Sequence, residues 1–305
     1  MVPTPAALVD PRRIVAEAWG GAWLASALTI ALERGLDATF DPTSDPIGDV
    51  LASVGLIEFG PDGWRFTEAV RREWGGYASE IAEALRSALG QSASASLWGP
   101  GHCDDLLDQE VVLARGRAMD TLGHRVVRAA SALGVSPLFE DGGGFLDVAT
   151  GSGAVAAAVA RAFPHARLVA VDPWALALAL ASRELAGEGL DERVELRHQG
   201  IDELEDDQVF DLAWLPVGHV GRETLAEGVF RLHRALRPGG WLLGYGFSGP
   251  GPEEALSRWQ TYLAGGTVLL ADEFDEVARA VGLAPASPVG SGSRARPLLG
   301  WRRPT

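Results

Sequence analysis

The sequence predicts an α/β fold in which a smaller, mainly helical amino-terminal domain precedes a doubly wound parallel sheet. Three observations predict this. From about residue 145 onwards, short apolar runs typical of buried strands alternate with helical segments. The first 96 residues instead show helical periodicity and a single small hairpin. The length of 305 residues also exceeds the usual size of one domain.

The amino-terminal segment has the pattern of a winged-helix-like domain, which combines helices with a hairpin. Its apolar residues recur at spacings of three and four in the helical stretches, and a Gly-Pro-Asp-Gly turn separates the two strands. The expected elements are helices over residues 12–34, 47–54 and 79–89, and strands over 55–59 and 64–67.

A small polar run, Gln91–Ser96, has the composition of a linker. We therefore expect an amino-terminal domain over residues 1–96. Residues 97–140 show interrupted helical periodicity and are expected to be linker helices that cover the ligand site. The parallel-sheet domain is expected over residues 141–305.

The carboxy-terminal domain alternates strands and helices with the spacing of a doubly wound sheet. Ligands of such sheets bind at the carboxyl ends of the strands. The expected strands cover residues 145–148, 167–171, 194–197, 209–215 and 240–245, and the expected helices cover 154–163, 175–186, 222–236 and 273–281.

The charge and composition exclude several classes of protein. The chain has 26 basic and 41 acidic side chains, a net charge of −15. Its first 96 residues carry seven arginines and thirteen acids, which argues against a DNA-binding winged helix and against a basic membrane-binding surface. Because Cys103 is the single cysteine and lysine is absent, a disulfide framework, a cysteine-based zinc cluster and a P-loop are excluded. No metal site, signal peptide or membrane span is predicted, and a cytoplasmic location is expected.

The first strand of the sheet leads into a glycine-rich loop that two classes of cofactor could use. Gly151-x-Gly153-x-x-Ala156, with Asp172 about twenty residues further on, satisfies the dinucleotide-binding pattern. Asp147 stands at the tip of the strand, where its charge would repel a pyrophosphate. S-adenosylmethionine instead carries an ammonium and a sulfonium, which a carboxylate attracts. Asp147 therefore favours S-adenosylmethionine.

Residues 141–305 resemble the class I S-adenosylmethionine-dependent methyltransferases, which have a Rossmann-like sheet. Four segments carry the resemblance in the right order: Leu146–Gly153 is similar to their first motif, Leu168–Pro173 to the second, Phe210–Trp214 to the fourth strand and Leu236–Trp241 to the fifth.

The resemblance implies where the cofactor binds. The glycine loop would approach the methionine part, and Asp172 would bind the ribose hydroxyls. Two positions depart from the pattern: Ala149 replaces the usual first glycine, and the acid expected after the third strand comes late, as Asp202. The backbone of Gly200 and the side chain of Ile201 are therefore the expected adenine contacts. The full set of expected cofactor-binding residues is Asp147, Ala149, Thr150, Gly151, Gly153, Asp172, Pro173, Gly200, Ile201 and Leu215.

The amino-terminal domain is similar to the dimerisation domain of small-molecule O-methyltransferases, in Leu51–Glu58 and Trp64–Glu68. That resemblance implies a homodimer. It also implies a small-molecule acceptor and no nucleic-acid or membrane partner.

His219 is the candidate catalytic base. It lies in the loop after the fourth strand, nineteen residues before Pro238, close to the offset of a catalytic histidine in plant-type O-methyltransferases. The aromatic and acidic residues that usually follow that histidine are absent here, and a purely structural turn histidine is the alternative. Trp98, Met119 and Tyr245 are the expected substrate-binding residues.

The predicted function is methyl transfer from S-adenosylmethionine to a small molecule, as an O-methyltransferase of secondary (natural-product) metabolism. Two alternatives stay open. The enzyme could keep the cofactor site and catalyse a non-methylating reaction such as a cyclisation. The chain could also be a winged-helix regulator, which its acidic charge disfavours.

Overall fold

The structure is a computed structural model that divides into two compact units, residues 1–93 and 94–305. Among the described residues, no helix is long and apolar enough to cross a membrane. The described residues are 11–41, 46–76, 78–98, 120–245, 258–259, 261–262, 266–286 and 298–305.

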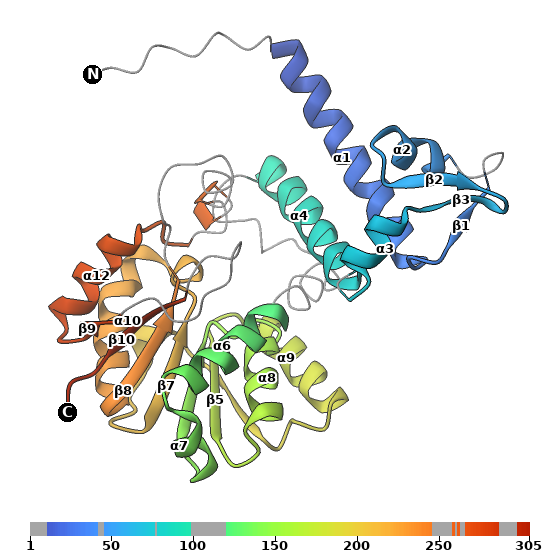
Figure 1. The fold of residues 1–305 in the computed structure, drawn as a ribbon. Coiled ribbons are helices and arrows are strands. Elements are labelled where there is room, and N and C mark those ends of the chain that lie inside the picture. Colours follow the sequence, from blue (N-terminus) through green and yellow to red (C-terminus); the bar gives the residue numbers. More distant parts are fainter. Residues whose placement is uncertain are drawn as a thin grey trace. The chain divides into compact units, whose positions relative to one another are not determined.

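The first unit combines helices with a three-stranded antiparallel sheet (Figure 1). The sheet has the order β1-β3-β2. Phe40 of β1, Leu51 of α2 and Phe66 of β3 are buried together in a small core. The elements are α1 (Pro11–Glu33), β1 (Thr39–Phe40), α2 (Ile47–Ser53), β2 (Ile57–Gly60), β3 (Gly63–Phe66) and α3 (Glu68–Trp74).

The division between the two units falls inside the run Gln91–Ser96, but these residues are helical and do not form an irregular linker. Helix α4 runs from Ala78 to Trp98 without interruption. The run contains no proline or glycine, and its alanines favour the helix, so small polar residues alone do not end it.

The second unit contains a seven-stranded sheet in the order β6-β5-β4-β7-β8-β10-β9 among the described residues. Five neighbouring strands, from β6 to β8, are parallel and confirm the predicted doubly wound sheet. At one edge of the sheet, β10 is antiparallel to both of its neighbours. Trp301 fixes this edge, because its indole nitrogen donates to Asp275 over 2.7 Å and its ring meets Phe274 edge-on. The strands are β4 (Gly144–Val148), β5 (Arg167–Asp172), β6 (Val194–His198), β7 (Phe210–Leu215), β8 (Leu236–Gly244), β9 (Ala284–Pro285) and β10 (Leu299–Arg302).

Helices cover both faces of this sheet (Figure 1). Alternate residues of each strand point to opposite faces, so that Phe145 packs with the helices of one layer and Leu146 with those of the other. Gly123 and Ala158 meet so closely that a Cβ on Gly123 would lie 2.6 Å from the Ala158 Cβ. One layer holds α6 (Asp120–Ala132), α8 (Ala154–Ala162) and α9 (Ala175–Gly187), the other holds α10 (Arg222–Ala235) and α12 (Ala271–Ala280), and the short α7 (Ser136–Glu140) leads into β4.

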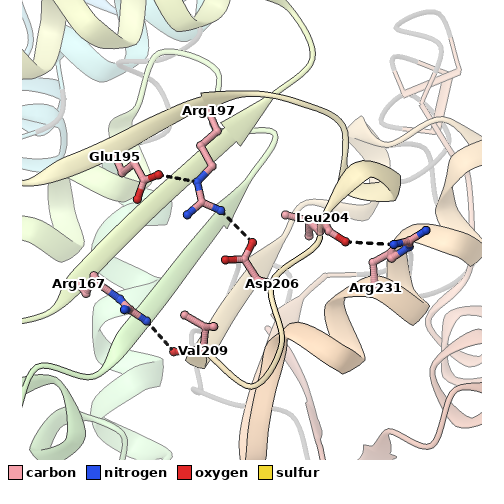
Figure 2. Close-up of polar contacts among 7 residues, drawn as sticks. All are labelled: Arg167, Glu195, Arg197, Leu204, Asp206, Val209 and Arg231. Atoms are coloured by element: carbon pink, nitrogen blue, oxygen red, sulfur yellow. Dashed lines mark hydrogen bonds and ion pairs between the residues drawn. The ribbon is translucent and has the colours of Figure 1, made fainter.

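Arginines hold the loop that connects the end of β6 to the start of β7. Figure 2 shows the Arg197 guanidinium between two carboxylates, donating to Glu195 and to Asp206 over 2.8 Å each. Further along, Arg167 donates to the Val209 carbonyl over 3.3 Å, and Arg231 approaches the Leu204 carbonyl at 3.5 Å. These contacts tie the loop to β5, β6 and α10, and they support the short helix η1 (Ile201–Glu203) at its beginning.

Candidate active site

The loop between β4 and α8 turns sharply at three residues with positive φ. Ala149, Gly151 and Gly153 have φ values of 50°, 58° and 84°. A Cβ on Gly151 would meet no atom within 4 Å, so this part of the loop faces open space. A Cβ on Gly153 would instead lie 3.3 Å from Ala181, because this residue packs against α9. Gly151 therefore leaves room for a ligand, whereas Gly153 serves helix packing.

Asp147 lies beneath this loop and is almost fully buried, with 1% of its surface exposed. Its Oδ2 atom accepts hydrogen bonds from the Thr150 hydroxyl over 2.7 Å and from the Ala156 amide over 3.1 Å. Burial and, to a smaller extent, the charge of the nearby Asp172 raise the pKa of Asp147 to about 7, although the two hydrogen bonds act in the opposite direction. Asp147 therefore orders the loop, and at neutral pH it carries only part of the charge that the sequence argument assigned to it.

Asp172 ends β5 beside the same loop, with 7% of its surface exposed. Its Oδ2 atom accepts from the Gly151 amide and its Oδ1 atom from the Trp174 amide, over 2.9 Å each. An ionised carboxylate only accepts hydrogen bonds, and its two oxygens offer about four lone-pair positions. A fixed carboxylate next to open space is suited to binding a diol.

The end of β6 forms the neighbouring part of this sheet edge. The Nε2 atom of His198 lies 2.9 Å from the Pro173 carbonyl oxygen. The Gly200 amide donates to Glu203 over 2.7 Å, and a Cβ on Gly200 would lie 2.6 Å from Oδ1 of Asp202. The carboxylate that comes late in the sequence is therefore folded back beside Gly200.

The side chain of Ile201 is 4% exposed and packs against α10. A Cβ on Gly228 of that helix would lie 2.5 Å from the Ile201 Cγ2 atom. The position of Gly200 at the sheet edge thus depends on how closely η1 and α10 approach each other.

His219 lies in the loop after β7, in the short helix η2 (Val217–His219). The preceding Leu215 is fully buried, and the exposed His219 is held by a 2.7 Å hydrogen bond from its amide to the Pro216 carbonyl. Its Nδ1 atom lies 3.3 Å from the Tyr245 hydroxyl. The structure therefore brings together one expected catalytic residue and one expected substrate-binding residue. Met119 lies outside the described residues, and only the backbone of Trp98 is described, as the last residue of α4.

Two threonines near His219 were not identified from the sequence. The buried Thr267 donates through its hydroxyl to the Val220 carbonyl over 2.6 Å, and its amide donates to the same oxygen over 3.0 Å. The Thr261 hydroxyl lies 3.2 Å from the position of a Cβ on Gly218. Thr267 therefore anchors a distant segment beside the η2 turn, and Thr261 lies close to the same turn. Isolated threonines in a sequence carry no signal for such contacts.

The glycine loop, the acid at the end of β5 and the strand order define the second unit as a class I methyltransferase fold. The family model described as a methyltransferase domain matches residues 145–240. The release factor glutamine methyltransferase of Rhodopirellula baltica is 34% identical over 114 residues, which is 37% of this chain and 37% of that protein. Residues 145–240 therefore match a methyltransferase domain, as predicted.

Solved structures of O-methyltransferases share the fold across both units. An O-methyltransferase family protein from Burkholderia thailandensis is 17% identical, with a TM-score of 0.71 over 98% of this chain and 99% of that one. The mitomycin 7-O-methyltransferase MmcR is 19% identical, with a TM-score of 0.68 over 96% and 97%. Human N-acetylserotonin methyltransferase, solved in complex with S-adenosylmethionine, is 15% identical, with a TM-score of 0.67 over 98% and 100%. The predicted fold class is thereby confirmed, including the helical amino-terminal region.

Proposed function

We propose that this protein is an S-adenosylmethionine-dependent enzyme that methylates an oxygen atom of a small molecule, in a natural-product pathway. The observation that carries the proposal is the Asp172 carboxylate, which two backbone amides fix beside the open side of Gly151. The methyltransferase-domain match supports it, as does the likeness to the fold of the mitomycin enzyme.

The residues present at the sheet edge fit the cofactor. Asp172 would accept hydrogen bonds from the two ribose hydroxyls, because an ionised carboxylate is an acceptor with two oxygens. Ala149, Thr150 and Gly151 would face the methionine part with their backbone, while Asp147 keeps that backbone in place from below. When bound, S-adenosylmethionine supplies a methyl group already activated on a sulfonium.

The adenine would lie against the end of β6 and the start of η1. Pro173 and Gly200 contribute backbone there, and the carboxylate of Asp202 lies next to Gly200. Because the Ile201 side chain packs against α10, we assign its contribution to the backbone. The buried Leu215 closes the site from β7.

His219 is assigned as the base that takes the proton from the acceptor hydroxyl. Its place after β7 and at the carboxyl edge of the sheet supports this role. Loss of the hydroxyl proton makes the oxygen a better nucleophile, and a positioned histidine is suited to accept it near neutral pH.

The first unit is assigned to homodimer formation. We assign its large exposed apolar side chains to the contact with a second copy of the chain. They are Trp23, Ile30, Val50, Val54 and Phe59, which are 38–64% exposed. Light scattering on the full chain tests this assignment, and a monomer at micromolar concentration would contradict it.

Mass spectrometry of small molecules that copurify with the chain tests the proposed function. S-adenosylmethionine or its demethylated product is expected. A nicotinamide dinucleotide in the site would contradict the proposal.

A further inference from the structure

Tyr245 and His219 follow two adjacent parallel strands, β8 and β7. Tyr245 directly follows β8, and the register of the sheet pairs Gly244 with Leu215, the last residue of β7. The pairing carries Tyr245 to the loop that leaves β7. There its hydroxyl oxygen lies 3.3 Å from Nδ1 of His219.

The tyrosine hydroxyl is placed from several sides. The Tyr245 ring packs at a centroid distance of 5.9 Å on Trp214, which is 1% exposed and belongs to the core of the sheet. A Cβ on Gly218 would lie 3.7 Å from the Tyr245 oxygen and 3.2 Å from the Thr261 hydroxyl. Glycine at position 218 therefore lets the η2 turn approach both hydroxyls.

A neutral imidazole carries its hydrogen on one nitrogen only, and the other nitrogen holds the lone pair. Which tautomer is present depends on the hydrogen bond that each nitrogen makes. A base that receives a proton at Nε2 must carry its hydrogen on Nδ1 beforehand. After the transfer both nitrogens are donors, so Nδ1 still needs an acceptor.

We propose that Tyr245 is a positioning residue whose hydroxyl oxygen accepts the hydrogen on Nδ1 of His219 and so keeps the ring's lone pair on Nε2. This inference rests on the proposed function, in which His219 takes the proton of the acceptor hydroxyl: the O–H bond breaks and an Nε2–H bond forms. Tyr245 acts on that step through the histidine. The same hydrogen bond then stabilises the imidazolium.

The tautomer can be measured without cofactor or acceptor. The full chain is labelled with ¹⁵N in its histidines, and the two-bond proton–nitrogen correlations of each ring are recorded at about pH 8, where an ordinary imidazole is neutral. The His219 signals are identified from their loss in His219→Gln. We expect Nδ1 of His219 to have the chemical shift of a protonated nitrogen and Nε2 that of an unprotonated one.

Tyr245→Phe removes only the hydroxyl group and should shift both His219 nitrogen signals toward the values of a tautomer mixture. Tyr262→Phe is the matched control, because this tyrosine is 52% exposed and its ring stacks on Trp259. The control should leave the His219 signals in place. Circular dichroism reports whether each variant is folded.

Either of two results would overturn the inference. One is a wild-type spectrum with the hydrogen on Nε2, which would mean that Tyr245 donates to Nδ1. The other is a Tyr245→Phe spectrum identical to the wild type. The wild-type spectrum alone shows which nitrogen of His219 carries the hydrogen, so it tests the inference even if the variant does not fold. S-adenosylmethionine binding is measured separately, so a failure of the proposed function is distinguishable from a failure of this inference.

Discussion

The main-chain amide of Gly151 donates a hydrogen bond to Oδ2 of Asp172 over 2.9 Å. This bond joins the loop after β4 to the end of β5, two segments that parallel pairing places side by side. Because Gly151 has a φ of 58° and faces open space, the same bond fixes the loop and turns the carboxylate toward the ligand site. The loop and the acid therefore form one unit.

Asp147→Asn should change how the stability of the protein depends on pH. The pKa of buried Asp147 is about 7, whereas an aspartate in an unfolded chain ionises near 4. Between these values the folded chain holds a proton that the unfolded chain has lost, so this carboxyl contributes stability at low pH that is lost as pH rises to about 7. The asparagine variant should lack this loss.

Chemical denaturation of both proteins at pH 5 and pH 8 measures the effect. Relative to the variant, the wild type should lose about 2–3 kcal/mol of unfolding free energy between these pH values, because about two pH units of the window between the two pKa values lie above pH 5. Parallel pH profiles of the two proteins would show that Asp147 does not titrate in this range.

The sequence predicted the parallel strands and the acids that end them, because strands buried on both faces read as continuous apolar runs. It could not predict that Asp147 points under the loop, since the partners Thr150 and Ala156 are set by the turn. The sequence predicted a role for His219 and one for Tyr245 but not their contact, because only the register of β7 and β8 brings the two residues together. Antiparallel β10 is four residues long and has too little pattern to be recognised.

Ala149→Gly should stabilise the protein. Ala149 has a φ of 50°, in the left-handed region that costs a residue with a Cβ about 1–2 kcal/mol. Glycine avoids that cost, although it increases the entropy of the unfolded chain. We expect a net gain of about 0.5–1 kcal/mol in thermal or chemical unfolding. Ala179→Gly, at an exposed position in α9, is the control and should lose a similar amount. A loss at both positions would argue against the left-handed conformation of Ala149.

Gly228→Ala should weaken both the fold and the adenine side of the site. The added methyl group would lie 2.5 Å from the Ile201 Cγ2 atom, so α10 or η1 must move. Overpacking of this kind costs about 1–3 kcal/mol of unfolding free energy. S-adenosylmethionine affinity should fall as well, because Gly200 precedes the displaced residue.

The control for this prediction is Gly187→Ala, at the end of α9. A Cβ there would meet no atom within 4 Å, so neither stability nor affinity should fall. If a folded Gly228→Ala variant binds S-adenosylmethionine as tightly as the wild type, η1 does not contribute to the cofactor site.

His219→Ala should lower methyl transfer by about 10²- to 10⁴-fold, the usual contribution of a positioned base. Transfer of a labelled methyl group from S-adenosylmethionine to a panel of small aromatic alcohols and phenols measures it. Cofactor affinity should stay the same, because the proposed role of His219 is to take a proton from the acceptor and not to bind the cofactor. A fall of less than tenfold would contradict the role of His219 as a base and leave it a structural residue of the turn.

Calorimetric titration of S-adenosylmethionine into the wild type and Asp172→Ala tests the central claim most directly. A lost charged hydrogen bond costs about 1.5–3 kcal/mol, so the variant should bind about 10- to 150-fold more weakly. Asp191→Ala, an exposed acid before β6, is the control and should bind as the wild type does. NAD should bind neither protein measurably. Unchanged S-adenosylmethionine affinity in a folded Asp172→Ala variant, or preferential binding of NAD by the wild type, would contradict it.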